Sequence, residues 1–206
     1  MGNVVIFGNQ KGGVGKSTLA VLYACWLADV RRRSVCVIDL DAQANSSKSL
    51  NQSSAIAEAV ELFGQDLGPI APPRERTIAL AAGCPIELEE YSIHGVADML
   101  RTVFGVRRRY NPQLRMAAIV LNRFNPHSLR QKAAMQDLAL NFREFVIPAR
   151  ISTRSAIPEA LAAGVPVWRL PKSAAREASL EVMRVFELLQ QRIDGSNAPM
   201  PADTQA

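Results

Sequence analysis

The sequence predicts an α/β fold: a single domain whose mostly parallel, twisted sheet is flanked by helices. Two observations support this prediction. The apolar, β-branched run "NVVIFG" (3–8) is followed by a helical pattern at 17–30 and a second apolar run, "VCVIDLD" (35–41). A strand, a helix and a strand in this order form a βαβ unit, which requires parallel strands and a right-handed crossover. Further apolar runs then alternate with helical patterns as far as residue 193.

Each predicted element follows from its pattern of apolar residues. The runs 3–8 and 35–41 lack polar alternation, so we expect strands buried on both faces. Helix 17–30 is apolar on most sides, as expected of a helix packed under neighbours. The remaining elements are a short helix within 55–63, strands at 77–83, 113–124 and 144–150, and helices at 93–110, 128–142, 157–165 and 173–193.

The last predicted helix, 173–193, is long and amphipathic. Its apolar residues form a single stripe at helical spacing: Ala178, Val182, Val185, Phe186, Leu189 and Ile193. The polar residues 194–206 that follow predict a disordered tail. We therefore expect one domain over residues 1–193.

The composition fits a soluble globular domain, with 206 residues, 48% hydrophobic and 21% charged. No apolar run approaches 18 residues and no secretion signal precedes the first strand, which argues against a membrane span or export. The cysteines (Cys25, Cys36 and Cys84) lack the spacing of metal ligands, and two of them fall in apolar elements. A cytoplasmic location follows.

Positive charge is concentrated in the middle of the chain. The net charge is +5 and the isoelectric point about 9.4. Residues 101–154 hold eleven basic side chains against two acidic ones, Asp137 and Glu144. Such an excess either binds an anionic partner such as nucleic acid or forms a solvated face.

The stretch "NQKGGVGKST" (9–18) lies between the first strand and the first helix. A glycine-rich turn at this position lets backbone N–H groups surround a phosphate at the positive end of the helix. Lys16 is placed to reach the β- and γ-phosphates, and Ser17 to ligate Mg²⁺. The predicted nucleotide-binding residues are Gly12, Gly13, Val14, Gly15, Lys16, Ser17 and Thr18. The sequence thus predicts a P-loop NTPase-like domain.

The form K-G-G-V-G-K-S-T is more specific than a general phosphate loop. It resembles the deviant Walker A signature of the ParA/MinD superfamily. The resemblance implies that Lys11 reaches across a dimer interface to the nucleotide of the other subunit. The active species would be an ATP-dependent sandwich dimer, and Lys11 and Lys16 would both be catalytic because cationic charge stabilises the phosphates of the transition state.

The segment "VIDLDAQANSS" (37–47) is similar to the segment that follows the family's second strand. The resemblance implies that Asp39 holds the water shell of Mg²⁺ and that Asp41 is the catalytic base. Ala42 and Ala44 stand where the family usually has proline and glycine. Carboxylates at the end of a parallel strand lie where α/β proteins bind ligands.

Two further segments resemble the family's adenine pocket. In "MAAIVLNRFNP" (116–126), Asn122 would hydrogen-bond the adenine edge. In "VIPARISTRSAIPEALAAGVPV" (146–167), Pro148 and Arg150 would line the base.

The family's Walker B strand, an apolar run ending in aspartate, is not found. The only candidate, "TIALAAG" (77–83), has no carboxylate, and "ELEEYSIHGV" (87–96) already resembles the segment after the next family strand. Relative to family domains, roughly 35–40 residues are missing near Cys84–Ile86. We therefore expect a sheet truncated by one or more core strands, with nucleotide binding retained and hydrolysis in question.

The resemblance implies a ParA-like partition ATPase that requires ATP and Mg²⁺, is nucleoid-associated, binds non-specific DNA and is stimulated by a ParB-type protein. The candidate DNA-binding residues are Arg150, Arg154, Lys172 and Arg176. A nucleotide-binding module without turnover is the main alternative. A MinD-like membrane ATPase fits less well because the chain ends in a polar tail instead of a basic amphipathic helix.

Overall fold

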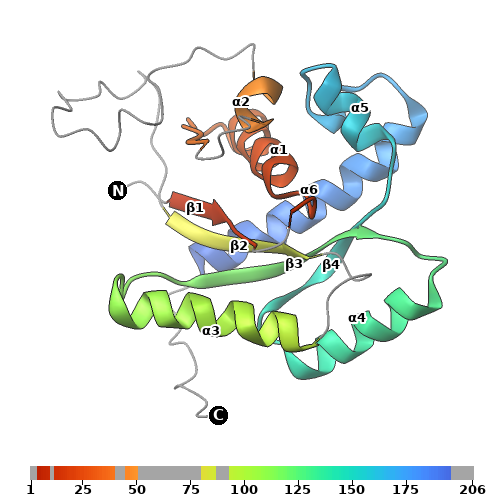
Figure 1. Cartoon of the computed structure of the whole chain (residues 1–206). Coiled ribbons are helices and arrows are strands. Elements are labelled where there is room, and N and C mark those ends of the chain that lie inside the picture. The colour runs from red at the N-terminus through yellow and green to blue at the C-terminus, as the bar shows by residue number, and fades with distance from the viewer. Residues whose placement is uncertain (1–3, 10–11, 40–44, 51–79, 87–92, 196–206) are drawn as a thin grey trace, which may run out of the picture.

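A computed structural model of the chain describes residues 4–9, 12–39, 45–50, 80–86 and 93–195. Its elements alternate between strands and helices and form three layers (Figure 1). In chain order they are β1 (Val4–Phe7), α1 (Lys16–Asp29), α2 (Asn45–Ser49), β2 (Leu80–Ile86), α3 (Ile93–Arg109), β3 (Met116–Phe124), α4 (Leu129–Asn141), β4 (Val146–Ser152), α5 (Ala156–Ala162), the 3₁₀ helix η2 (Val167–Arg169) and α6 (Ser173–Asp194).

The four described strands form one parallel sheet in the order β1-β2-β3-β4. The predicted parallel sheet is therefore confirmed. The strand predicted at 77–83 lies a few residues later, at 80–86, and pairs with β1 from Val4 opposite Leu80. Because the strands are parallel, the carboxyl ends of β1, β3 and β4 lie at the same edge of the sheet.

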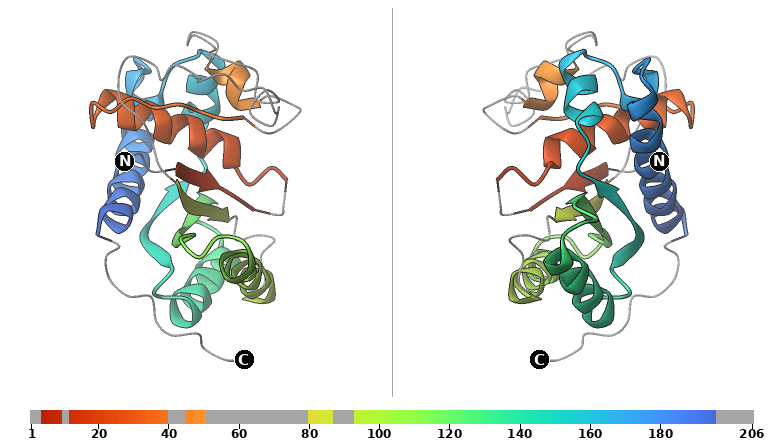
Figure 2. Two further views of the ribbon diagram at one scale, coloured as in Figure 1. Left: turned by 90° about the vertical axis from the view of Figure 1, so that its left-hand side faces the viewer. Right: turned by 90° about the vertical axis from the view of Figure 1, so that its right-hand side faces the viewer.

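Helices cover both faces of the sheet (Figure 2). Each face has its own hydrophobic core. On one face, α1, α5 and α6 pack against Ala118, Val120, Ile147 and Ile151 of β3 and β4. On the other face, α3 and α4 cover Ile119, Leu121 and Phe124, among others. Successive residues of β3 thus point to opposite cores, which explains why this strand reads as a continuous apolar run.

Helix α6 confirms the predicted apolar stripe. Ala178, Val182, Val185, Phe186 and Leu189 are all fully buried. The ring of Phe186 packs against α1, with ring centroids 5.2 Å from Tyr23 and 6.1 Å from Trp26. The long helix α6 is therefore part of the core and holds α1, which begins at the phosphate loop, against the sheet.

The strand predicted over 35–41 is wrong for residues 35–39, which have no strand structure, and residues 40 and 41 lie outside the described residues. The predicted burial of the first strand is also wrong, because Val4 and Ile6 are 39% and 45% exposed. The first of these two results has a physical cause in the pairing of strands. A strand needs a hydrogen-bonded neighbour, and β1 pairs only with β2 among the described strands. The short helix predicted within 55–63 and residues 196–206 of the predicted tail also lie outside the described residues.

Candidate functional site: the phosphate loop

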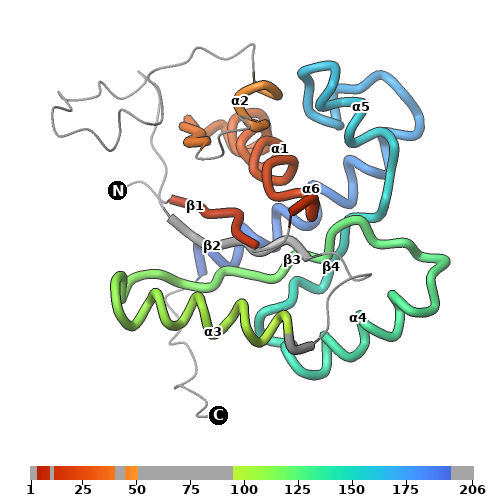
Figure 3. Tube along the Cα trace, in the orientation of Figure 1, coloured from red at the N-terminus to blue at the C-terminus, as the bar shows by residue number. Residues whose placement is uncertain are grey.

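The chain leaves β1 at Phe7 and enters α1 at Lys16, and the glycine-rich segment joins the two (Figure 3). Gly13 and Gly15 have φ angles of 78° and 91°. These are left-handed conformations that only glycine adopts without strain. Gly15 caps the helix, and its carbonyl accepts the first helical hydrogen bond, from Leu19 N at 2.9 Å. The glycine spacing is therefore required by the path of the loop.

The loop is anchored by one apolar side chain and presents three polar ones. Val14 is fully buried between the glycines, whereas Lys16, Ser17 and Thr18 are half-buried in the first turn of α1. The N-terminus of a helix carries a partial positive charge, which favours an anion. The predicted phosphate-binding residues thus lie together at the start of a 14-residue helix.

The end of β3 contacts the loop directly. The side-chain amide of Asn122, which is 5% exposed, donates to the carbonyl of Val14 at 2.9 Å. A Cβ atom on Gly15 would lie 2.3 Å from Asn122 Nδ2, so no other residue fits at position 15 without displacing this amide. Asn122 was predicted to contact adenine. In the structure its Nδ2 bonds the phosphate loop, and the adenine contact stays a prediction.

Arg123, the next residue, also reaches the loop. Its guanidinium donates to the carbonyl of Gly13 at 3.3 Å. The backbone of Arg123 has a φ of 53°, which is unusual for a residue other than glycine. This contact was not predicted, because a sequence pattern gives no sign that an arginine at a strand end will turn back toward a loop 110 residues earlier.

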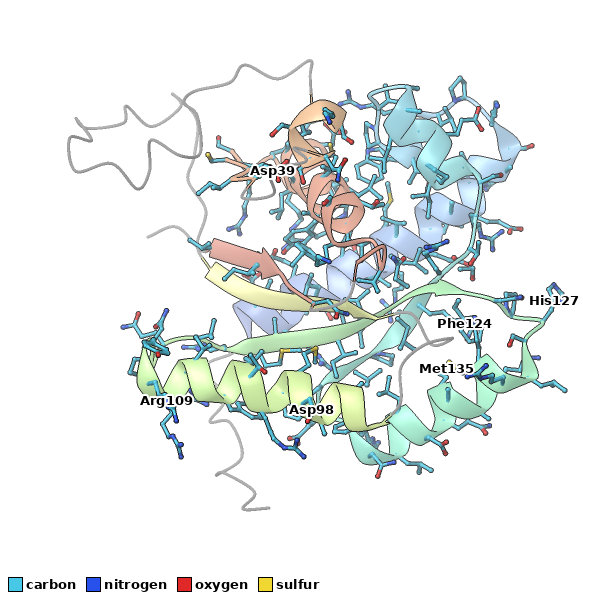
Figure 4. The ribbon with its side chains drawn as sticks, in the orientation of Figure 1. Asp39, Asp98, Arg109, Phe124, His127 and Met135 are labelled. Carbon is cyan, nitrogen blue, oxygen red and sulfur yellow. The ribbon has the colours of Figure 1, made fainter. Side chains whose placement is uncertain are left out.

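Asp39, the predicted magnesium residue, lies near the start of α2 (Figure 4). Its Oδ2 accepts hydrogen bonds from the backbone N–H of Ser47 at 3.0 Å and from the Ser47 hydroxyl at 3.2 Å. The carboxylate therefore fixes α2 against the segment 35–39. Lys11 and Asp41, two of the three predicted catalytic residues, lie outside the described residues.

Pro148 and Arg150, predicted to line the base, lie on β4 and are exposed. Arg150 is paired in register with Leu121 on β3, one residue before Asn122. Its guanidinium covers the ring of Phe124 at 4.5 Å from the centroid. Arg150 is thus held beside the end of β3 by a cation–π contact.

Two of the predicted DNA-binding residues carry ion pairs. Arg154 donates to Glu177 at 2.6 Å and to Glu181 at 2.9 Å. Lys172 contacts the carboxylate of Glu159. Arg176 is exposed, and among the described residues it forms no ion pair that would neutralise it.

Glu181 is a further residue that the sequence did not single out. Its carboxylate accepts hydrogen bonds from Ser152 N at 2.7 Å and Ser152 Oγ at 3.0 Å, besides the pair with Arg154. Burial acts to raise the pKa of Glu181, but the hydrogen bonds from Arg154 and Ser152 outweigh it, so this pKa lies below its ordinary value. The carboxylate fixes the end of β4 to α6.

A separate cavity of about 190 Å³ lies between α1, α2 and the turn after α5. Its lining includes Cys25 and Asp29, and the Asp29 carboxylate accepts hydrogen bonds from Trp168 Nε1 at 3.0 Å and from Arg169 at 2.6 Å.

Within the part of the chain that the structure describes, no cluster of histidine, cysteine and carboxylate residues could hold a metal ion by itself.

Comparison with known families shows which family the chain belongs to. Residues 5–167 match the family described as the CobQ/CobB/MinD/ParA nucleotide binding domain. The chain belongs to this family. The matched region contains the phosphate loop and the end of β3, so the loop geometry described above is that of a nucleotide-binding domain.

Related sequences include two proteins named IncC and a chromosome-partitioning ATPase. The protein IncC from Escherichia coli is 29% identical over 243 residues, which covers 86% of this chain and 66% of that protein. A second Escherichia coli IncC is 31% identical, and the chain covers only 47% of it. The chromosome-partitioning ATPase Soj from Thermus thermophilus is 28% identical over 69% of this chain and 78% of its own length. The chain therefore spans between about half and two thirds of the IncC relatives.

Solved structures share the fold. Apo McdA from Cyanothece matches with a TM-score of 0.69 at 12% identity, over 94% of this chain and 100% of that chain. Cobyrinic acid a,c-diamide synthase from Mycobacterium smegmatis, solved with an ATP analogue and magnesium, matches with a TM-score of 0.67 at 15% identity, over 99% and 100%. The predicted P-loop NTPase-like fold and the resemblance to the ParA/MinD superfamily are both confirmed.

The relatives are longer within the aligned region. The region aligned with IncC is 243 residues long, whereas the whole chain here has 206. IncC therefore contains residues inside this region that have no counterpart in this chain.

Proposed function

We propose that this domain binds ATP with Mg²⁺ at the phosphate loop and acts as a ParA-like partition ATPase. The observation that carries the proposal is the loop itself: two left-handed glycines join β1 to α1 and bring Lys16 and Ser17 to the helix N-terminus. The name of the relative Soj, a chromosome-partitioning ATPase, supports the partition role. Binding of ATP with magnesium is supported by the cobyrinic acid a,c-diamide synthase structure, which holds both kinds of ligand.

The chain offers suitable groups for each part of this chemistry. The Lys16 ammonium would neutralise the β- and γ-phosphates. A serine hydroxyl and a carboxylate are oxygen ligands of the kind that Mg²⁺ prefers, so Ser17 would bind the ion directly and Asp39 through its water shell. Mg²⁺ would offset charge on the phosphates. Asp41 would orient the attacking water, and Lys11 would act on the nucleotide of a second subunit.

Sedimentation with ATP, with ADP and without nucleotide tests the sandwich dimer. We expect a dimer only with ATP, and a monomer under all three conditions for Lys11→Ala. Lys16→Ala serves as the control that cannot hold the phosphates. A dimer that forms equally without nucleotide, or that survives Lys11→Ala, contradicts the proposed role of Lys11.

A nucleotide-binding module without turnover is the second candidate. It is favoured by the residues that IncC has and this chain lacks, and by β2, whose sequence "LAAGCPI" contains no carboxylate. We propose that the missing segment includes the Walker B strand. Phosphate release, measured with DNA and a ParB-type protein present, separates the candidates. Release above that of Lys16→Ala supports the ATPase, and ATP binding without such release supports the module.

Non-specific DNA is the proposed polyanion partner, because the basic excess of residues 101–154 suits contacts to the phosphate backbone. Among the four candidates, Arg176 has no carboxylate partner in the described residues, whereas Arg154 and Lys172 do. The slope of log affinity against log salt concentration measures the number of phosphate contacts. We therefore expect Arg176→Ala to reduce this slope for duplex DNA by about one contact, and Lys172→Ala to reduce it less. Affinity for duplex that does not change with salt would contradict DNA binding through charge.

A further inference from the structure

We propose that the end of β3 is a clamp that holds the phosphate loop in its anion-binding shape. The β3 clamp consists of Asn122 and Arg123, whose side chains bind the successive carbonyls of Val14 and Gly13. Both are positioning residues: they act on the nucleotide through the loop. The proposal rests on the proposed binding of nucleotide at this loop and assigns what prepares the loop for it.

The direction of the loop's N–H groups follows from these two contacts. In a trans peptide unit the N–H points opposite to the C=O. The Gly13 carbonyl points to Arg123 and the Val14 carbonyl points to Asn122. The N–H groups of Val14 and Gly15, which belong to the same two peptide units, therefore point away from the β3 side. Successive backbone N–H groups that face an anion together bind it in this kind of loop, and we infer that these two N–H groups do so here.

The backbone of Arg123 supplies a second, independent observation. Its φ of 53° is left-handed, a conformation in which glycine would be unstrained. The surroundings hold this conformation, since Thr153 Oγ1 donates to the Arg123 carbonyl and Thr153 N to the Phe124 carbonyl, each at 2.9 Å. A strained backbone that persists beside a ligand loop indicates a role for the side chain it presents. That side chain is the one that reaches Gly13.

The two clamp residues differ in burial, which makes them complementary probes. Asn122 is 5% exposed and lies under Gly15, whereas Arg123 is exposed at the surface. Replacing Asn122 removes a buried hydrogen bond and affects stability as well as the loop. Replacing Arg123 removes a surface contact, so its effect on binding is separable from folding.

Titration calorimetry with ATP and with inorganic tripolyphosphate, both with Mg²⁺, tests the clamp on the full chain. Tripolyphosphate occupies the phosphate cradle and has no base. We expect Arg123→Ala to weaken both ligands by the same factor, about three- to tenfold, and Asn122→Ala to weaken both by a larger common factor. Arg123→Lys should recover part of the loss. Arg130→Ala, an exposed arginine on α4, is the matched control and should bind as the wild type does.

Arg123→Gly provides the readout that a merely structural role would not give. Glycine relieves the left-handed backbone, so this variant should melt about 2–4 °C above Arg123→Ala. It should nevertheless bind both ligands as weakly as Arg123→Ala does. If Arg123→Gly instead binds both ligands more tightly than Arg123→Ala, in line with its higher melting temperature, the clamp is wrong.

The ligand pair separates the remaining outcomes. If Asn122→Ala weakens ATP but leaves tripolyphosphate unchanged, Asn122 reads the adenine and is not part of a clamp. If the wild type binds ATP and tripolyphosphate and the Arg123 variants bind each ligand as tightly as the wild type does, the clamp is wrong and the nucleotide function stands. A wild-type chain that binds neither ligand refutes the proposed nucleotide function itself.

Discussion

Substituting alanine for Gly15 tests the packing of the phosphate loop against β3. The new Cβ would lie 2.3 Å from Asn122 Nδ2, and the backbone φ of 91° disfavours any side chain. The left-handed backbone costs about 1–2 kcal/mol for alanine. Displacing the Asn122 amide loses its hydrogen bond to Val14, which adds about 0.5–1.5 kcal/mol. For a chain of 206 residues the sum, about 1.5–3.5 kcal/mol, lowers Tm by about 3–14 °C.

The neighbouring glycines are built-in controls for this measurement. Gly13 also has a positive φ, of 78°, but a Cβ there meets nothing within 4 Å. Gly13→Ala should therefore lose only the backbone contribution, about 1–2 kcal/mol. A Cβ on Gly12 likewise meets nothing within 4 Å, and Gly12→Ala should stay within about 0.5 kcal/mol of the wild type.

Thermal unfolding of the three variants should rank them Gly12→Ala, Gly13→Ala and Gly15→Ala in falling order of stability. Combining Gly15→Ala with Asn122→Ala removes the atom that the new Cβ would strike. The double variant should then be more stable than the sum of the two single effects predicts. Equal stability of Gly12→Ala and Gly15→Ala, or strict additivity in the double variant, would refute this account of the loop.

Two further predictions concern the frame around the site. Phe186→Ala removes a fully buried ring that packs against Tyr23 and Trp26. It should lower the free energy of unfolding, measured in urea, by about 3–5 kcal/mol. A loss below about 1 kcal/mol would show that α6 does not hold α1 in place. The hydrogen bonds from Arg154 and Ser152 lower the pKa of Glu181 in the folded state, so its stabilisation is present above the ordinary value of 4.5 and is lost as pH falls through the lower folded pKa. Urea unfolding should therefore show a stability difference between wild type and Glu181→Gln that is largest near neutral pH and shrinks below pH 4.5; a difference that grows on acidification would contradict this sign.

The sequence was sufficient for elements that carry their own periodicity. The helices α1, α3, α4 and α6 and the strand β3 were predicted within about three residues, because their apolar patterns are long and unbroken. The same reasoning failed for residues 35–39. Their apolar, β-branched composition is that of a strand, but strand structure depends on a partner that the pattern of one segment cannot reveal.

The candidate site shows a similar division. The glycines, Lys16 and Ser17 follow from a contiguous motif, so the sequence placed them correctly at the start of α1. The contacts that shape the loop come from Asn122 and Arg123, more than 100 residues away. Such contacts depend on strand order and on side-chain direction at a strand end. Neither is encoded in local spacing, which is why Arg123 was missed.

The groups proposed for nucleotide binding and those proposed for hydrolysis lie in different parts of this chain. The loop and its clamp belong to β1, α1 and β3, and the core under α1 and α6 fixes these elements. The proposed magnesium residue Asp39 instead follows α1, in the segment 35–39, which has no strand structure, and its carboxylate accepts hydrogen bonds from Ser47. A rigid cradle suffices to bind phosphate, but catalysis also requires carboxylates held in place relative to it. The proposed loss of the Walker B strand would therefore impair turnover and leave binding intact. A chain that binds ATP tightly, depends on the clamp and releases no phosphate is the outcome that this division of roles predicts for the module without turnover.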